Sequence, residues 1–223
     1  MVLSFFKKNE KGLELIAHRT ISMLADARHS FDLASAAVLS GAETASVAED
    51  IRATDEHINK AEQALRGELV THVAVHGSTD IGSVLSYTLL IKKIERIGDQ
   101  AKNILDLAEE GVSLVGEEDT VELIEIRRVI SSMFAEAADL MAEATTEEAQ
   151  EFYDRATELR YSIESKIRDY MHSEQPGSYV VPRAVLYRYW KRIVANLAGI
   201  VTGANEPLQK QGYINDGEID LDD

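Results

Sequence analysis

The chain has 223 residues, of which 45% are hydrophobic and 28% are charged, so it can bury a substantial core and is too apolar to be disordered. Its formal net charge of −16 repels phosphate backbones and anionic lipid headgroups, which argues against general nucleic-acid binding. The absence of cysteine excludes disulfides, thiol nucleophiles, thiolate zinc sites and iron–sulfur clusters.

The chain begins MVLSFFKK, an apolar run followed by two lysines. This run is shorter than the ~7 to 15 apolar residues at the centre of a signal peptide, and no stretch approaches the ~20 apolar residues of a membrane span. We therefore expect a cytoplasmic protein. The apolar side chains of Val2, Leu3, Phe5 and Phe6 could dock on a membrane protein, but folding back on the chain's own bundle is the simpler interpretation.

Helical periodicity dominates the sequence, and all three prolines (Pro176, Pro182 and Pro207) lie in its last quarter. Proline interrupts helices because it lacks the backbone N–H and fixes φ, so the 175 residues before Pro176 can form long helices. Breaks in the pattern predict six helices, at about residues 9–40, 44–76, 80–111, 118–143, 147–174 and 183–204. The predicted fold class is all-α.

Two further features indicate how these helices are organised. The segment from Leu13 (LELIAHRTISMLADA) is similar in spacing to the segment from Val121 (VELIEIRRVISSMFAEA), which indicates an internal repeat. Thr145 and Glu148 have the spacing of a capping box at the start of a helix. We predict two tandem antiparallel three-helix bundles, at residues 1–115 and 116–205, followed by a disordered acidic tail at 206–223.

The third predicted helix carries a row of oxygen-bearing side chains. Glu95, Asp99 and Asn103 are four residues apart, so they share one side of the helix. The row lies nearly opposite the apolar seam, so we expect it to point outward or across the groove between the bundles. Carboxylates on consecutive turns can chelate a hard cation. The neighbouring Lys92 and Lys102 equally fit a solvated row of salt bridges, which is the commoner use of such a pattern.

The second predicted helix places two acids among its apolar residues. Asp55 and Glu62 lie on the side of this helix that carries its seam of Ile and Leu residues. A buried carboxylate is costly unless it is paired or bound to a metal, so both need partners, such as Arg66 or a base from another helix. A polar core pair that fixes the register of the bundle and a metal site both remain open.

Catalytic motifs do not stand out. A ferritin-like di-iron centre requires a Glu-x-x-His motif on each of two helices. Only Asp26 and His29 have that spacing here, with Asp in place of Glu. Phosphate-binding glycine loops and nucleophile elbows are missing from the sequence. No cluster of basic residues that could bind an anion is visible either, so we expect a non-enzymatic protein that senses ligands through a partner.

The segment IERIGDQAKNI, residues 94–104, resembles the E-R-I-G-D-x-A-x-N-I motif of the PhoU family. The resemblance implies six helices in two bundles and a cytoplasmic, often dimeric protein. It also implies a divalent or ferric metal ion (Mg, Mn, Fe or Zn) on the acidic motif, where Glu95, Asp99, Asn103, Asp55 and Glu62 are the candidate ligands. The implied function is a regulatory adaptor that restrains phosphate uptake and phosphate-starvation signalling.

The implied partners are a phosphate ABC transporter or permease component and a sensor histidine kinase, with membrane contact only through them. The alternative is an accessory scaffold of a permease or another transporter, without a functional metal site. The second repeat departs from the motif, because RYWKRIVANLAGI has Lys191, Ala195 and Gly199 where the first repeat has its three oxygen donors. Since a lysine repels a cation, we expect the second bundle to have lost its metal site.

Overall fold

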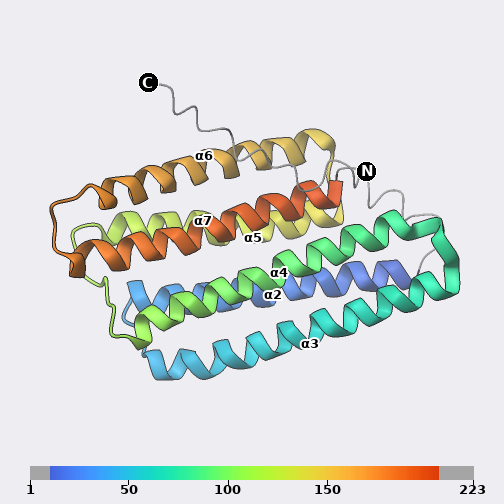
Figure 1. Ribbon diagram of the computed structural model, residues 1–223, viewed down its shortest axis with the longest axis horizontal. Helices are drawn as coiled ribbons and strands as arrows, with labels where there is room; N and C mark the ends of the chain where they lie inside the picture. The colour runs from blue at the N-terminus through green and yellow to red at the C-terminus, as the bar shows by residue number, and fades with distance from the viewer. Residues whose placement is uncertain (1–10, 206–223) are drawn as a thin grey trace.

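The computed structural model describes residues 11–205, which fold into six α-helices and one short 3₁₀ helix (Figure 1). The helices are α2 (Lys11–Leu39), α3 (Thr44–His76), η2 (Gly77–Asp80), α4 (Ile81–Glu109), α5 (Thr120–Ala142), α6 (Thr146–Met171) and α7 (Gly177–Asn205). No strand forms within these residues. The predicted all-α class is confirmed. The segments expected to dock at the N-terminus and to be disordered at the C-terminus lie outside the described residues.

The helices form two three-helix bundles that lie side by side. Helices α2, α3 and α4 pack together in the first bundle, and α5, α6 and α7 form the second. In Figure 1 the near layer runs α3, α4, α7, α6 from bottom to top, with α2 and α5 behind it. The bundles meet where α4 packs on α7 and α2 packs on α5. Helix α4 therefore has neighbours on three sides: α2, α3 and α7.

Helix boundaries follow the local sequence signals with one exception. The capping box before α6 is present: the Glu148 backbone N–H donates to Thr145 Oγ1 at 3.2 Å, and the Thr145 backbone N–H donates to Glu148 Oε2 at 2.8 Å. Helix α7, however, begins at Gly177, not at residue 183 as predicted, and includes Pro182. The Pro176 carbonyl accepts the backbone N–H groups of Tyr179 and Val180, so the helix starts one residue after Pro176. Pro182 is tolerated near that end, where few helical hydrogen bonds are lost.

The connection between the bundles is tied to the end of α2. The backbone N–H of Leu114 donates to the carbonyl of Val38 at 2.9 Å, which ties the connection to the end of α2. Where α2 packs on α5, the rings of Phe31 and Phe134 stack with centroids 5.5 Å apart. The expected domain boundary at residues 115/116 lies in this connection, between α4 and α5. Within residues 11–205, none of the helices is long and apolar enough to span a lipid bilayer.

The start of α7 is held by a buried arginine. Arg183 is only 2% exposed, and its guanidinium donates to Asp119 through Nε at 2.7 Å and Nη2 at 2.8 Å. It also donates to the Tyr179 carbonyl at 3.0 Å and lies 3.7 Å from the centroid of the Tyr179 ring. Two parallel hydrogen bonds fix both position and orientation, so this pair clamps the first turns of α7 onto the residue before α5.

Candidate metal-binding site and interaction surface

The acidic row of α4 lies against α3, in the same bundle. The Glu95 side chain is 13% exposed, whereas Asp99 is 45% exposed. The expectation that the row points outward or into the groove between bundles is therefore wrong for Glu95. Gly98 explains the close approach of α3: a Cβ atom at this position would lie 3.3 Å from Cδ1 of Ile58. Because glycine adds no side chain, α3 can pack directly beside the row.

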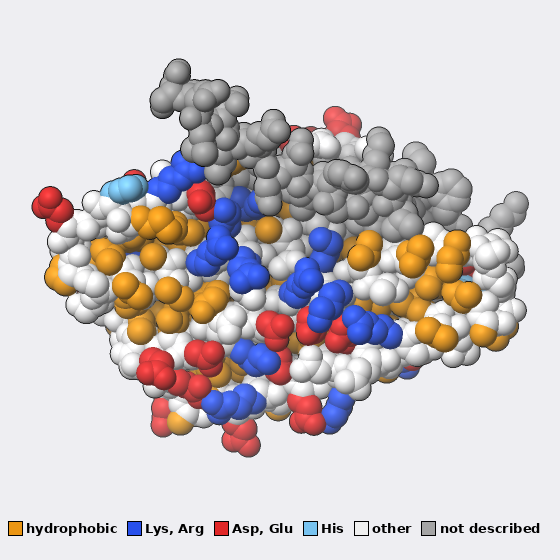
Figure 2. All heavy atoms as spheres, in the orientation of Figure 1, with side chains coloured by type: hydrophobic (Ala, Val, Ile, Leu, Met, Phe, Trp, Pro, Cys, Tyr) orange, Lys and Arg blue, Asp and Glu red, His pale blue; other side chains and the backbone are white. Residues whose placement is uncertain are grey.

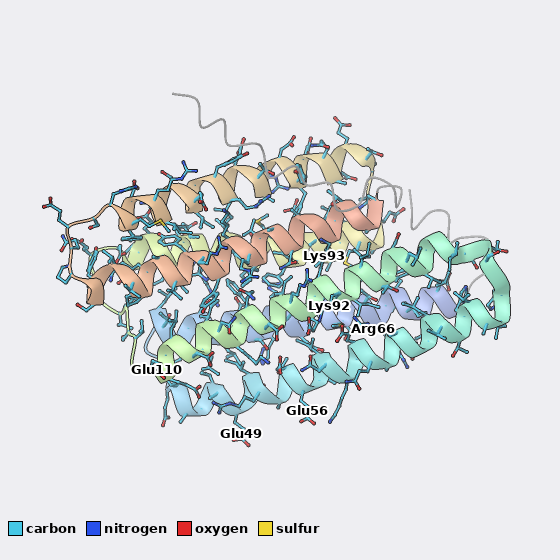
Figure 3. The ribbon with its side chains drawn as sticks, viewed as in Figure 1. Glu49, Glu56, Arg66, Lys92, Lys93 and Glu110 are labelled. Atoms are coloured by element: carbon cyan, nitrogen blue, oxygen red, sulfur yellow. The ribbon has the colours of Figure 1, made fainter. Side chains whose placement is uncertain are left out.

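The first pair of carboxylates in this interface is Glu62 on α3 and Glu95 on α4. Lys92 lies between them, with its Nζ 2.7 Å from Glu95 Oε2 and 3.8 Å from Glu62 Oε1. Arg66 approaches Glu62 Oε1 to 2.8 Å through Nη2, which confirms the expected partner on the same helix. Figure 3 shows Lys92 and Arg66 together where α4 meets α3. Glu62 is only 8% exposed, so these two cations supply the countercharge that its burial requires.

A second pair, Asp55 and Asp99, lies further along the same interface, about one turn away on α4 and two turns away on α3. Lys102 donates to Asp55 Oδ2 at 2.9 Å and lies 3.5 Å from Asp99 Oδ1, while Asn59 donates to Asp55 at 3.2 Å. Burial alone lowers the pKa of Lys102, but its hydrogen bond to Asp55 and the charges of both carboxylates raise it above its usual value. Lys102 is therefore held firmly in its charged form.

These contacts restrict how the predicted ligands could bind a metal ion. Carboxylate oxygens from adjacent helices suit a hard cation, but each pair already contacts a lysine, Lys92 or Lys102, that supplies positive charge. Across residues 11–205, no group of three or more His, Asp and Glu side chains is arranged to hold a metal ion. Within the same residues, the side chain of Asn103 forms no hydrogen bond with another residue. A cation entering either pair would have to displace Lys92 or Lys102.

The histidines do not assemble around the acidic row. Asp26 and His29, the residues with near di-iron spacing, contact different residues of α3. Asp26 lies 2.9 Å from Nδ1 of His57, and His29 lies 3.1 Å from Asp50. Each is an isolated His–Asp contact on the surface of the first bundle. The di-iron interpretation therefore finds no support in these contacts.

The second bundle replaces the carboxylate pair by an ion pair. Lys191 on α7, in the motif position of Glu95, donates to Oε2 of Glu164 on α6 at 2.5 Å. This hydrogen bond lowers the pKa of Glu164 more than burial raises it, so the pair stays ionised. Because a lysine replaces one of the two carboxylates, the Lys191–Glu164 pair is electrically neutral without a further cation.

Gly199, in the motif position of Asn103, makes room for a lysine of the other bundle. A Cβ atom at Gly199 would lie 2.5 Å from Nζ and 3.0 Å from Cε of Lys93. Lys93 thus crosses from α4 directly onto the backbone of α7 (Figure 3). Burial, together with the charge of Arg96, lowers the pKa of Lys93. No ion pair between Lys93 and another residue of the described range compensates this burial.

A basic surface that no local sequence pattern reveals forms around this contact. Arg188 and Arg192 are exposed on α7, four residues apart, and both precede Gly199 in the sequence. Arg96 is exposed on α4, one turn after Lys93. Figure 2 shows Lys and Arg side chains gathered over α4 and α7 in the middle of this face. We call Lys93, Arg96, Arg188 and Arg192 the basic strip. Its two halves are more than 90 residues apart in sequence, and only the packing of α4 on α7 unites them.

Comparison with known proteins agrees with this architecture. Residues 16–108 match the family model of the PhoU domain. The crystal structure of PhoU from Pseudomonas aeruginosa superposes with a TM-score of 0.70 at 21% sequence identity, covering 86% of this chain and 95% of that one. The phosphate transport system regulatory protein PhoU from Streptococcus pneumoniae gives 0.65 at 17% identity, covering 87% and 95%. No curated protein matches the chain. The resemblance seen in residues 94–104 is confirmed by the domain match, and the fold by both structures.

Proposed function

We propose, from the PhoU domain at residues 16–108 and the PhoU fold of both bundles, that the protein is a non-enzymatic regulator of phosphate transport. The observation that carries the proposal is the domain match, which covers the whole acidic row of α4 and its partners on α3. The Streptococcus pneumoniae structure with the same fold is described as a phosphate transport system regulatory protein. The protein would work in the cytoplasm and restrain phosphate uptake and phosphate-starvation signalling through contacts with other proteins.

The proposed partners are a phosphate ABC transporter or permease component and a sensor histidine kinase. The described surface offers a face for such contacts, because Ile81, Leu85 and Leu89 form a row along α4 and are 43–44% exposed. An exposed apolar row on a helix is a typical protein-binding surface. We therefore place one partner contact on the first turns of α4. A homodimer is part of the same proposal, and size-exclusion chromatography with light scattering measures it.

The experiment that tests the function is affinity purification of the tagged full chain from phosphate-replete and phosphate-starved cells, followed by mass spectrometry. We expect a phosphate transporter component or a sensor kinase to co-purify in amounts that depend on phosphate. Leu85→Ser should weaken recovery of the partner, whereas Val129→Ser, at an apolar position of similar exposure on α5 (40% against 44%), should not. Recovery of neither partner class under either condition contradicts the proposal.

Metal binding is a separate proposal. The carboxylates of Asp55, Asp99, Glu62 and Glu95 offer oxygen donors to a divalent or ferric ion, which would replace Lys92 and Lys102 as the countercharge. Competition with a lysine makes a clear prediction: Lys102→Met should increase Mn²⁺ affinity, measured by isothermal titration calorimetry, and Asp99→Ala should abolish it. Asp106→Ala, at an exposed acid on the same helix, is the matched control. Equal affinity in all these variants contradicts a metal site at this position.

One observation favours a second candidate function, an accessory transporter scaffold without a metal. Each carboxylate pair already contacts a lysine, Lys92 or Lys102, which supplies countercharge without a metal ion. The calorimetric series above separates the two candidates. If Mn²⁺ does not bind and a transporter component still co-purifies, the scaffold function is supported.

A further inference from the structure

The basic strip is an uncompensated cluster of cations on a strongly acidic protein. The chain as a whole carries a net charge of −16, yet Lys93, Arg96 and Arg192 form no ion pair with any residue of the described range. Arg188 lies within electrostatic reach of Glu164, but Glu164 accepts its hydrogen bond from Lys191. Elsewhere on the described surface, arginines usually contact a carboxylate, as Arg155 contacts Glu136. The basic strip is therefore available to bind negatively charged groups.

The geometry of the strip fits an extended acidic segment better than a single small anion. Arg188 and Arg192 are on consecutive turns of α7, ~6 Å apart along the helix axis, and Lys93 meets the same helix at Gly199, ~10 Å further on. The cations thus follow the helix axis for about three turns. Repulsion within the strip, seen in the effect of Arg96 on the pKa of Lys93, would be relieved by a ligand that brings several negative charges.

The chain itself supplies such a segment after α7, within the same C-terminal part of the sequence. Residues 216–223, DGEIDLDD, contain five acidic residues and no lysine or arginine. Arg188 is 17 residues before the end of α7 at Asn205, which places it ~26 Å back along the helix. Residue 216 is 11 residues beyond Asn205, and an extended connection of that length spans up to ~36 Å. The acidic segment can therefore reach every cation of the strip, and tethering gives it a high local concentration there.

We propose that residues 216–223 bind the basic strip on α4 and α7 of the same molecule and so shield it from other acidic ligands. This contact is a built-in competitor: an acidic partner segment gains access to the strip only when it displaces the C-terminal segment. The proposal goes beyond the proposed role in phosphate transport and does not depend on it, because it concerns an intramolecular contact that exists without any partner.

Paramagnetic relaxation enhancement on the full chain tests the contact. The chain has no cysteine, so Asn215→Cys gives a single attachment point for a nitroxide label beside the acidic segment. We expect selective broadening of the amide signals of Arg96, Arg188 and Arg192 at low salt. In 1 M NaCl, where the Debye length falls to ~3 Å, this broadening should disappear.

The matched control keeps the length of the tether and removes its side-chain charge: Asp216, Glu218, Asp220, Asp222 and Asp223 are replaced together by Asn or Gln in the labelled chain. Broadening near the end of α7 should persist in this variant, because the label is still tethered there, while broadening at Arg188 and Arg192 should be lost. Neutralising the strip with Arg188→Gln and Arg192→Gln should have the same effect. Arg155→Gln, on α6, should leave the pattern unchanged.

Two results would overturn the proposal. One is broadening that fades evenly with distance from Asn205 and is the same in the charged and neutralised chains, because this shows a free tether. The other is broadening of the strip only in mixtures of labelled, unenriched protein with unlabelled, ¹⁵N-enriched protein, because this places the segment on a second copy.

Discussion

Replacing Arg183 by methionine should destabilise the protein by about 2–4 kcal/mol, because it breaks a buried ion pair from one side. Loss of one partner of such a pair typically costs about 3–5 kcal/mol. The Asp119 side chain is 13% exposed and keeps a 3.4 Å contact with the Tyr170 hydroxyl, so water and Tyr170 should recover part of that cost. Methionine preserves most of the buried aliphatic volume, which leaves the lost hydrogen bonds and charge as the main effect.

The assay is guanidinium denaturation of the full chain followed by circular dichroism at 222 nm. Arg155→Met is the matched control, because its partner Glu136 and Arg155 itself are largely exposed, and such pairs contribute about 0–1 kcal/mol. Equal free energies of unfolding for the two variants would refute the argument that Arg183 clamps α7 to the start of α5.

Acid titration of the same two variants gives an independent measurement. Burial raises the pKa of Asp119, but the hydrogen bonds and charge of Arg183 outweigh it and hold the pKa below its usual value. The stabilisation by ionised Asp119 is therefore complete above its ordinary pKa of ~3.9 and is lost as the pH falls through the lower folded-state pKa. Arg183→Met should flatten this acid dependence, while Arg155→Met should retain it.

Three further predictions address single positions. Gly67→Ala should stabilise the protein by about 0.5–1 kcal/mol in thermal or chemical denaturation, because Gly67 is exposed within α3 and a Cβ there has open space around it. Gly199→Ala should push the ammonium of Lys93 into solvent and move the Lys93 pKa back up towards its usual value, as measured by NMR on ¹³C-labelled lysine; an unchanged pKa contradicts the packing described. Thr145→Ala should cost about 1 kcal/mol and raise the lowered pKa of Glu148, because the capping box is lost; a change in neither quantity would show that the cap is not formed in solution.

The fold was predictable because the signals that set it are local. A long proline-free region with helical periodicity is visible in any window of the sequence, and the capping box of Thr145 and Glu148 requires only four residues. The pairs Lys92–Glu95 and Lys102–Asp99 are also local, three residues apart on one helix, and both form. By contrast, the sequence pattern places the start of the last helix at residue 183, after Pro182, whereas α7 begins at Gly177, directly after Pro176.

The surroundings of the acidic row depend on packing that no local pattern reveals. The row was placed opposite the apolar seam of its helix and therefore expected to face outward or the other bundle. Helix α4, however, is flanked by α3 and α7 in the near layer and backed by α2, so its non-seam sides are also partly covered. Pairing of Lys102 with Asp55 and the position of Lys93 on Gly199 both depend on the register between neighbouring helices. The basic strip was invisible for the same reason.

The packing of α4 on α7 and of Phe31 on Phe134 has a consequence for work with fragments. Each bundle uses two of its three helices to cover the other, so a fragment that stops in the connection near residue 115 would leave that side of α4 and the Phe31 ring in water. Such a fragment should aggregate or pair with itself through the uncovered side. Mixing the two halves as separate chains should restore solubility, because each half then recovers the surface for which its sequence was selected. Ligand or partner binding measured on an isolated half would consequently report on a surface that the intact chain buries.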